Sequence, residues 1–299
     1  MRIAITGASG LIGSALCESL ERDGHQPIRV VRHDPSPGAV RWNIERAEID
    51  AVGLEGLDAV VHLAGEGIGD KRWSAEQKRK IFESRTKGTS LLAGALASLS
   101  RKPAVLVSGS AVGYYGDRGD EQLAESSGPG TGFLAEVAAA WESEAAPVAA
   151  AGIRVATIRT GIVLDRDGGA LAKMASIAKF GLLGRLGSGR QWMSWITLAD
   201  EVRAIRFLID TDITGPVNLT APTPVTNAVF TKALGRVLHR PTVFPVPAFG
   251  PKLLLGSELA TALLLDGQRA VPDVLVGAGF EFEHVDVETA MAAVLGRAV

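Results

Sequence analysis

A glycine-spaced turn near the start of the sequence has a pattern typical of nucleotide phosphate binding. The stretch ITGASGLIGSAL places three glycines directly after an apolar run and at the start of a helical pattern. Such glycines allow a tight turn, close approach of the backbone to a pyrophosphate, and close packing of helix on strand. The helix N-terminus also offers N–H groups and a positive dipole end to phosphates. The residues expected to bind a dinucleotide here are Gly7, Ser9, Gly10, Leu11, Ile12 and Gly13.

The end of the next apolar run, QPIRVVRHD, bears on which dinucleotide is bound. NAD-binding proteins place Asp or Glu about twenty residues past the glycines, on the ribose 2′-hydroxyl. Arg32 stands at that place in this chain. A guanidinium suits the 2′-phosphate of NADP(H), so the sequence favours NADP(H) over NAD. The alternative is a solvated Arg32 with Asp34 serving the ribose.

A second group of candidate reactive residues lies in VSGSAVGYYG, residues 107–116. The chain's two tyrosines, Tyr114 and Tyr115, stand side by side here, shortly after Ser108 and Ser110. At the carboxyl end of a buried strand they would lie at the mouth of the crevice, where a phenol can exchange a proton with a substrate. The alternative is that both rings pack the cleft or brace the following loop. No lysine is nearby to lower the pKa of either phenol.

The elements that would carry these residues alternate between strand and helix. Short apolar runs predict strands at RIAIT, QPIRVVRHD, DAVVHLAG, PAVLVSGS and IRVATIRTGIVL. Apolar residues at helical spacing predict helices over 11–24, 74–99 with a break near Gly88, and 132–152. This alternation predicts an α/β protein with a Rossmann-type, doubly wound, mostly parallel sheet.

Beyond about residue 165 strands and helices no longer alternate regularly, which predicts a second domain. Helical patterns over 168–181 and 198–210 follow, and the segment from Pro222 onward holds seven of the 14 prolines. We expect residues 1–165, with about 191–215, to form the nucleotide-binding domain. About 166–190 and 216–299 would form a smaller C-terminal α/β substrate domain.

Composition limits the kinds of partner. The formal net charge is −2 with no basic block, so nucleic acid is not an expected partner. The five histidines are scattered, and we expect no metal site. Cys17 is the chain's one cysteine, which fits a reduced, cytoplasmic compartment. No signal peptide or apolar run of membrane-spanning length is seen, so no membrane partner is expected.

Several of these stretches carry a family resemblance. In order, TGASGLIG, DAVVHLAG, LVSGSAVGYYG and IRTGIVL resemble the extended short-chain dehydrogenases of the epimerase/dehydratase branch. AGEGIGDKRW, ESRTKGT, GSGRQWMSWITLADEV, GPVNLTAPTPVTNAVF and LLDGQRAVPDVLVGAGFEF resemble one atypical subfamily, often called epimerase family proteins. Its C-terminal domain has no assigned function. The resemblance covers nearly the whole chain and implies a Rossmann fold with NADP(H) along the strand ends, but no known substrate.

The resemblance also implies positions for cofactor-binding residues. Arg85 stands where an asparagine near the nicotinamide half is usual. It could contact a cofactor phosphate or an anionic substrate, or merely form an ion pair on the helix surface with Glu83 or a neighbour. His62 is expected to be a packed strand residue rather than an acid. Further cofactor contacts are implied for Leu63, Ala64, Gly65, Ser108, Ile162 and Val163.

Two more residues of the resemblance have open or structural roles. Arg159 would close the carboxamide side of the site or cap its strand. Asp200 is expected to be a helix N-cap.

The usual catalytic pair of this superfamily is absent. A Tyr-x-x-x-Lys pair is expected on the helix after the serine strand, and Phe133 and Val137 stand at those places. Ser110, or Ser108 with a shift, keeps the serine, and Tyr115 or Tyr114 could supply the missing hydroxyl. The candidate catalytic residues are therefore Ser110, Tyr115 and Tyr114. Glu66 and Glu136 are less favoured candidate bases. The tryptophans Trp73, Trp192 and Trp195 could line an apolar substrate wall or belong to the core.

Two functions fit this pattern. The first is an NADP(H)-dependent oxidoreductase or epimerase-like enzyme acting on a small carbonyl or sugar-like substrate. The second is a non-catalytic NADP(H)-binding protein that senses redox state or binds a partner. The resemblance implies that a homodimer could form through the helices that flank the serine strand, and TSLLAGALASL is apolar enough for such a contact. The alternative is that this apolar side faces the sheet.

Overall fold

An eight-stranded sheet is the centre of the molecule. The computed structural model describes residues 1–33, 37–178, 183–242 and 245–297. The strand order is β12-β8-β6-β5-β1-β2-β3-β4, and every pair is parallel except β3 with β4. The doubly wound α/β prediction is confirmed. The strands are β1 (Arg2–Thr6), β2 (Gln26–Val31), β3 (Val40–Asn43), β4 (Glu48–Ile49), β5 (Ala59–His62), β6 (Val105–Ala111), β8 (Arg154–Thr160) and β12 (Gly215–Leu219).

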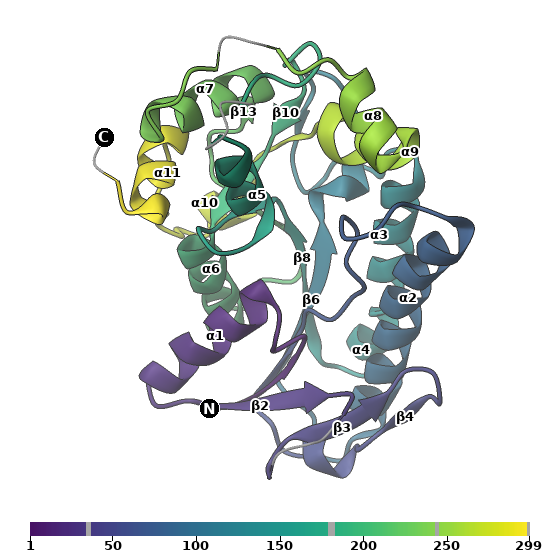
Figure 1. Cartoon of the computed structure of the whole chain (residues 1–299). Coiled ribbons are helices and arrows are strands. Elements are labelled where there is room, and N and C mark those ends of the chain that lie inside the picture. The colour runs from purple at the N-terminus through teal and green to yellow at the C-terminus, as the bar shows by residue number, and fades with distance from the viewer. Residues whose placement is uncertain (34–36, 179–182, 243–244, 298–299) are drawn as a thin grey trace.

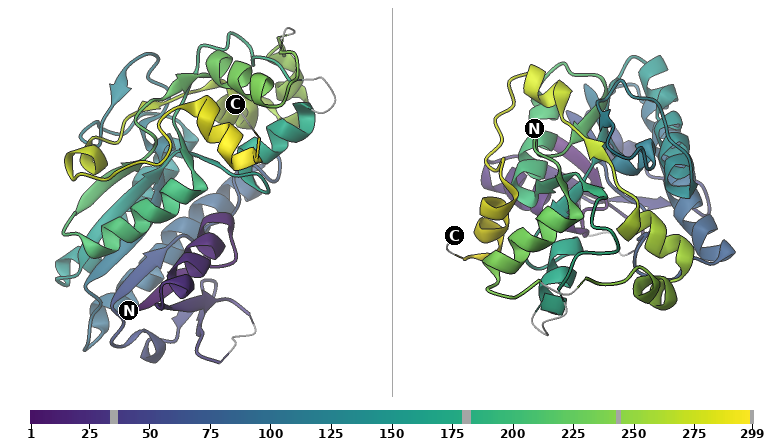
Figure 2. Two further views of the ribbon diagram at one scale, coloured as in Figure 1. Left: turned by 90° about the vertical axis from the view of Figure 1, so that its left-hand side faces the viewer. Right: turned by 90° about the horizontal axis from the view of Figure 1, so that it is seen from above.

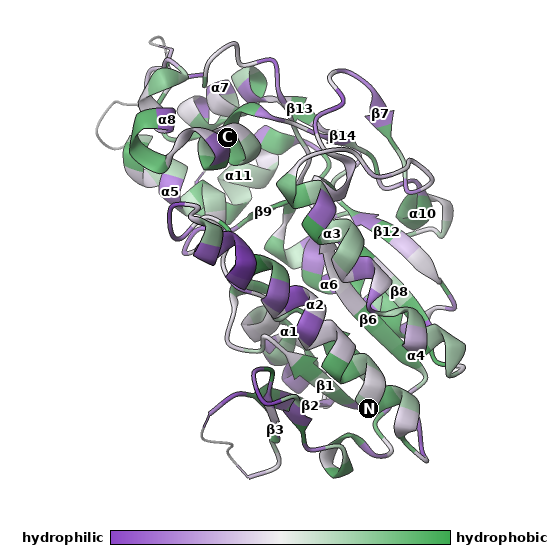
Figure 3. Ribbon diagram, turned by 90° about the vertical axis from the view of Figure 1, so that its right-hand side faces the viewer, coloured by the Kyte–Doolittle hydropathy of each residue, from purple (hydrophilic) through white to green (hydrophobic). Residues whose placement is uncertain are grey.

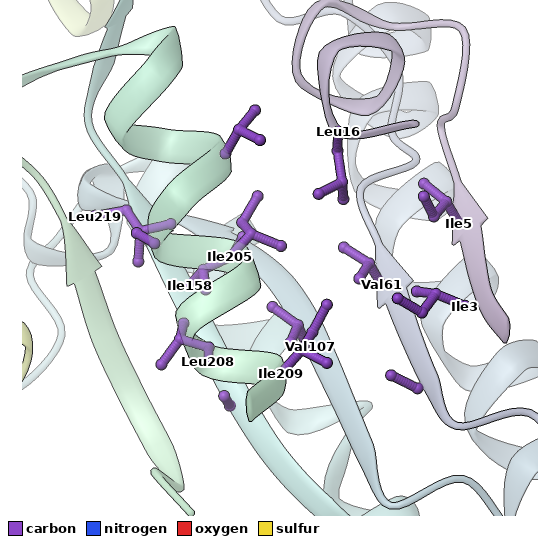
Figure 4. Packing of buried hydrophobic residues seen from close by; sticks show 14 of the residues in the cluster. Ile3, Ile5, Leu16, Val61, Val107, Ile158, Ile205, Leu208, Ile209 and Leu219 are labelled. Atoms are coloured by element: carbon purple, nitrogen blue, oxygen red, sulfur yellow. The ribbon is translucent and has the colours of Figure 1, made fainter. Parts of the chain in front are cut away.

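Helices cover both faces of this sheet, as Figure 1 shows. The helices α1 (Leu11–Arg22) and α6 (Leu198–Asp210) lie on one face. The other face carries α2 (Ala75–Ser98), α3 (Phe133–Ser143) and α4 (Ala146–Ala150). The strands read as continuous apolar runs because they are buried on both sides. Figure 4 shows the core under α1 and α6, where Ile5, Leu16, Val107 and Ile205 are among the fully buried residues.

The helix α2 runs without the break that we expected near Gly88. Its N-cap is Ser74, whose hydroxyl accepts a hydrogen bond from the Gln77 N–H at 3.1 Å. A Cβ built on Gly88 would lie 3.3 Å from Ile44 Cδ1, so the glycine serves close packing of the β3–β4 region on the helix. The first half of α2 is largely hydrophilic in Figure 3.

Two elements predicted as continuous are divided. The expected strand over 153–164 ends at Thr160, and β9 (Ile162–Leu164) leaves the sheet to pair with β11 (Trp195–Thr197). A Cβ built on Gly161 would lie 2.6 Å from the Ser194 carbonyl oxygen, so the change of direction at Gly161 needs a glycine. The expected helix over 132–152 divides into α3 and α4, with Pro147 in the first turn of α4.

A smaller layer of helices lies at the carboxyl ends of the strands (Figure 2). Its core includes Trp195, Phe230, Leu234 and Met291. The helix predicted over 168–181 is seen over α5 (Gly169–Ala178), and its end lies outside the described residues. The helices of this smaller layer are α5, α7 (Asn227–Val237), α8 (Phe249–Leu255), α9 (Ser257–Ala260), a π-type turn η3 (Thr261–Leu265) and α11 (Val287–Leu295). The short helix α10 (Asp273–Gly277) packs instead on β12 of the main sheet.

Short strands and turns complete the chain. Two small sheets join β10 with β13 and β14 with β7. None of the helices in the described ranges is both long and apolar enough to cross a lipid bilayer. These elements are β7 (Gln122–Leu123), β10 (Trp192–Met193), β13 (Val225–Thr226), β14 (Arg269–Ala270), η1 (Val52–Leu54) and η2 (Val112–Tyr115).

The two parts of the chain are tied together at several points. β12 continues the main sheet to Leu219, past the boundary expected near residue 215. Leu275 of α10 and Phe280 are buried in the main core.

Asp200 is not the N-cap of α6 that the sequence predicted. The N-cap is Thr197, because its hydroxyl accepts a hydrogen bond from the Asp200 N–H at 3.1 Å. The buried Asp200 carboxylate instead accepts from main-chain N–H groups of the C-terminal segment at residues 283 and 284.

Candidate functional site

The glycine turn after β1 forms a cradle with no room for side chains. Gly7 has φ +69°, and a Cβ on it would lie 2.9 Å from the carbonyl carbon of Leu63. A Cβ on Gly13 would lie 2.2 Å from the Gly7 carbonyl oxygen, so α1 packs directly on the turn. Gly10 is exposed and is the N-cap of α1 without any side-chain cap. The N–H groups of the first turn of α1 are therefore open to an anion, and the turn fits a pyrophosphate.

The other residues predicted for this turn surround it. Ser9 is exposed, and Leu11 and Ile12 are half-buried at the start of α1. A Cβ on Gly168 would lie 2.9 Å from Leu11 Cδ1, so the loop before α5 lies beside the turn. Arg32 is exposed one residue past the end of β2. Asp34, the alternative ribose partner, lies outside the described residues.

Thr6 links the glycine turn to the end of β5. Its hydroxyl accepts from the N–H groups of Leu63 at 3.1 Å and Ala64 at 3.2 Å. It also lies 2.7 Å from Nδ1 of His62. His62 is fully buried, and this burial lowers its pKa to about 4, so its ring is neutral near pH 7. His62 is therefore a packed residue of β5. Through Thr6 it helps to hold residues 63–64, which lead to the exposed Gly65.

Arg85 of α2 lies against that segment. Its Nη1 donates to the carbonyl oxygens of Glu66 at 2.9 Å and Ile81 at 3.2 Å. A Cβ on Gly65 would lie 3.0 Å from its Cζ. Glu83 pairs with Lys87 at 3.1 Å, and Arg85 forms no ion pair within the described residues.

Ser110 and Tyr115 are held in a buried polar network. The Ser110 hydroxyl donates to Oε1 of Glu142 at 2.6 Å, and Arg159 Nε donates to the same oxygen at 2.8 Å. Arg159 Nη1 donates to the Tyr115 hydroxyl at 2.9 Å, and that hydroxyl donates to Asn218 Oδ1 at 2.7 Å. Burial raises the pKa of the Tyr115 phenol, which opposes its ionisation. This geometry favours the packing interpretation of Tyr115.

Tyr114 differs from its neighbour. Its ring is half-buried, and the Arg159 guanidinium stacks on it with Cζ 3.6 Å from the ring centroid. In the part of the chain that the structure describes, no hydrogen bond to its hydroxyl is seen. Of the two phenol hydroxyls, that of Tyr115 is hydrogen-bonded inside the protein, whereas that of Tyr114 has no such bond within the described residues.

The place of the missing catalytic pair is apolar. Phe133 is half-buried at the start of α3, 4.9 Å between ring centroids from Trp73, and Val137 is buried. Lys78 of α2 lies over the Phe133 ring at 4.5 Å and pairs with Glu258 at 2.6 Å. An ammonium group therefore lies beside Phe133, but its partner comes from α9 rather than from a phenol.

Ser108 is fully buried, and its hydroxyl has no partner among the described residues. It pairs in register with His62, and the nearby Trp141 indole N–H is also without a partner there. Ile162 and Val163 are half-buried on β9, directly after the break at Gly161.

The remaining candidates separate into interior and surface residues. Glu66 is half-buried, and its Oε1 accepts from Gln77 Nε2 at 3.2 Å, whereas Glu136 is exposed on α3. Trp195 is fully buried. Trp192 is half-buried, with its indole N–H donating to Asp120 at 2.8 Å. No cluster of metal-ligating side chains occurs within the described ranges.

Two important acids were not foreseen from the sequence. Glu142 sits late in α3, and its pairing depends on how closely that helix approaches β6 and β8, which no local pattern indicates. Glu201 of α6 is fully buried, accepts from the Thr160 hydroxyl at 2.8 Å, and has its pKa raised to about 8 by burial. Its second oxygen has no partner within the described part of the chain. A Glu inside the apolar pattern LADEVRAI was a visible sign of this second acid.

The doubly wound sheet, the glycine cradle and the open helix N-terminus define a dinucleotide-binding protein. A family model described as the NAD-dependent epimerase/dehydratase family matches residues 3–219, and a domain of unknown function matches 246–294. The chain belongs to the NAD-dependent epimerase/dehydratase family, which confirms the resemblance.

Relatives share nearly the full length of the chain. Epimerase family protein Mb2239 of Mycobacterium bovis is 45% identical over 291 residues, 97% of this chain and 96% of that protein. The chloroplastic epimerase family protein SDR39U1 homolog of Arabidopsis thaliana is 40% identical over 309 residues, 99% of this chain and 87% of that protein.

Solved structures of the same fold extend this comparison. Human epimerase family protein SDR39U1 (isoform 2), crystallised with NADPH, matches with TM-score 0.90 and 28% identity over 100% of both chains. The nucleoside-diphosphate sugar epimerase of Corynebacterium glutamicum matches with TM-score 0.81 and 38% identity, over 99% of this chain and 58% of that one.

Proposed function

We propose that this chain binds NADP(H) and uses it as an oxidoreductase or epimerase-like enzyme on a small carbonyl or sugar-like compound. The glycine cradle carries this proposal: only glycine fits at 7 and 13, where the turn packs on Leu63 and α1 packs on the turn, and this packing leaves the exposed start of α1 facing the place of a pyrophosphate. Exposed Arg32 supplies a guanidinium on the adenosine side for a 2′-phosphate. The NADPH of the human relative's structure supports the same choice.

The choice of cofactor is tested by binding. We expect the purified chain to bind NADPH more tightly than NADH in a fluorescence titration. Arg32→Ala should reduce that preference about tenfold or more, since a charge-assisted phosphate contact is lost. Arg29→Ala is the matched control, because Arg29 lies on the same strand and pairs with Glu21 at 3.7 Å. Equal binding of NADH and NADPH by the unaltered chain would contradict the assignment.

A proton donor is needed beside the hydride. Bound NADP(H) would supply or accept the hydride, and a carbonyl oxygen that is being reduced requires a proton. We assign this role to the Tyr114 hydroxyl, because Tyr115 and Ser110 already donate theirs within the protein. The packed Phe133 and Trp73 rings suit a substrate with an apolar part, and the Lys78 ammonium lies beside them.

A non-catalytic NADP(H)-binding protein is the second candidate, and one observation favours it. The Ser110 and Tyr115 hydroxyls are both bound internally, and Phe133 and Val137 carry no proton-handling group. A panel of aldehydes, ketones and nucleotide sugars, followed by NADPH absorbance, separates the two. Steady turnover that Tyr114→Phe abolishes supports the enzyme. Tight NADPH binding with no turnover across the panel supports the non-catalytic function.

A further inference from the structure

Arg85 of α2 is a half-buried cation whose guanidinium lies at the carboxyl end of β5. Its guanidinium lies between Gly65, whose Cβ would approach Cζ to 3.0 Å, and the Trp141 ring, whose centroid is 5.0 Å from Cζ. One nitrogen, Nη1, is bound to two main-chain carbonyl oxygens. Hydrogen bonds from Nε and Nη2 are absent within the described residues. Part of the guanidinium is thus held in place while part remains open.

No acid within the described ranges forms an ion pair with Arg85. Among the described residues no carboxylate oxygen comes within 4.0 Å of the Arg85 guanidinium. Glu66 is the acid that acts on it electrostatically, but its carboxylate accepts from Gln77. Burial lowers the pKa of Arg85 to about 10, so it still carries its charge near pH 7. The neighbouring His62 ring is neutral there.

The sheet order places Arg85 on the nicotinamide half of the site. A dinucleotide crosses the carboxyl ends of the strands with its pyrophosphate at the turn after β1. The strands β2 and β3 lie on one side of β1, and β5, β6 and β8 lie on the other. Arg32 follows β2 on the adenosine side. Arg85 lies at the end of β5, on the opposite side.

We propose that Arg85 makes the site select the reduced cofactor, NADPH, over NADP⁺. The inference rests on the proposed NADP(H) binding. The oxidised nicotinamide ring carries a positive charge, and the reduced ring is neutral. A fixed, unpaired guanidinium in the nicotinamide half repels only the oxidised ring, and the buried surroundings weaken the screening of this repulsion. The bound couple is therefore held toward its reduced form.

The test compares two dissociation constants for each variant of the full chain. NADPH is titrated by fluorescence and NADP⁺ by calorimetry, and the ratio Kd(NADP⁺)/Kd(NADPH) is recorded. Arg85→Met keeps the aliphatic stem and should lower the ratio about tenfold. That change corresponds to a shift of about 30 mV in the potential of the bound couple. Arg85→Lys should preserve the ratio, and Glu66→Gln, which removes the nearby negative charge, should raise it.

The outcomes separate this inference from its alternatives. Equal weakening of both redox forms in Arg85→Met would make Arg85 a phosphate ligand and overturn the proposal. An unchanged ratio, or a ratio near one in the unaltered chain, would also overturn it while leaving NADP(H) binding intact. Failure of the unaltered chain to bind either form would remove the proposed function as well. Arg101→Met, at a side chain 77% exposed, is the control for general charge effects, and melting curves show that each variant is folded.

Discussion

Nη1 of Arg159 lies 2.9 Å from the hydroxyl of Tyr115, deep between β6, β8 and β12. Glu142 joins this pair from α3 by two hydrogen bonds to Arg159, and Asn218 joins it from β12. The sequence predicted Tyr115 at the mouth of the crevice, but in the structure its side chain is part of the interior. Its hydroxyl serves to hold strands and helix together.

Tyrosine-to-phenylalanine changes should distinguish the two neighbouring rings. Tyr115→Phe leaves the buried Asn218 Oδ1 without its donor and removes one acceptor of Arg159 Nη1, so we expect the free energy of unfolding to fall by about 1–3 kcal/mol. Tyr114→Phe keeps the ring that stacks on Arg159, so the free energy of unfolding should change by less than about 0.5 kcal/mol. Urea unfolding measures both. Equal losses in the two variants would contradict the difference in their environments.

Arg159 should be a strong determinant of stability. Arg159→Met leaves the Glu142 carboxylate half-buried without its cation, which costs about 3–5 kcal/mol in buried pairs. The double variant Arg159→Met with Glu142→Leu should recover part of that loss, because no uncompensated charge remains. Unfolding curves for the single and double variants form a cycle. A double variant no more stable than Arg159→Met would show that packing, rather than charge, dominates.

A glycine exchange in the cradle should separate binding from folding. A Cβ on Gly10 would lie 3.3 Å from the Gly7 carbonyl oxygen, a contact that small movements relieve. Because Gly10 is exposed at the start of α1, the added methyl group would occupy space where the pyrophosphate is expected. Gly10→Ala should therefore weaken NADPH binding about tenfold or more with little loss of stability. Gly94→Ala is the matched control: a Cβ there meets nothing within 4 Å. It should leave binding unchanged and raise stability by about 0.5–1 kcal/mol.

The buried acid Glu201 should give the protein a distinctive dependence on pH. Burial raises its pKa from 4.5 to about 8. Between these values the folded chain keeps a proton that the unfolded chain has released, so the free energy of unfolding falls as pH rises through this window. Glu201→Gln removes this dependence. Between about pH 5 and about pH 8, the free energy of unfolding of this variant should come to exceed that of the parent by about 1–3 kcal/mol.

Urea midpoints across that window check the Glu201 prediction. The exposed Glu136→Gln should follow the parent at every pH. A Glu201→Gln variant whose stability runs parallel to the parent from acid to neutral pH would show that Glu201 ionises normally.

The sequence predicted what depends on local geometry. Gly7, Gly10 and Gly13 are recognisable because a turn, a backbone approach and a helix contact each require the absence of a side chain nearby. Other glycines carry no such local sign. In the sequence, Gly88 and Gly161 each interrupt a regular apolar pattern in the same way. In the structure, Gly88 allows close packing inside an unbroken helix, whereas Gly161 follows the end of a strand.

The partners of the candidate catalytic residues could not be predicted for a related reason. Tyr115 and Asn218 are 103 positions apart, and their hydrogen bond depends on which strands become neighbours and in what register. Arg85 was recognisable as a departure from a family pattern. That no acid among the described residues pairs with it is a property of the folded chain and was not visible in the sequence.

The return of the chain to the main core at Leu275 and Phe280 has a consequence for biosynthesis. A ribosome makes β1, α1 and the glycine cradle first, yet these two residues belong to the same buried cluster as Ile3 and Leu16. Residues 283 and 284 are also needed to satisfy the Asp200 carboxylate. The nucleotide-binding half therefore cannot finish folding during translation until the segment around 273–284 has left the exit tunnel. A nascent chain arrested before that point would expose an unfinished apolar face to chaperones.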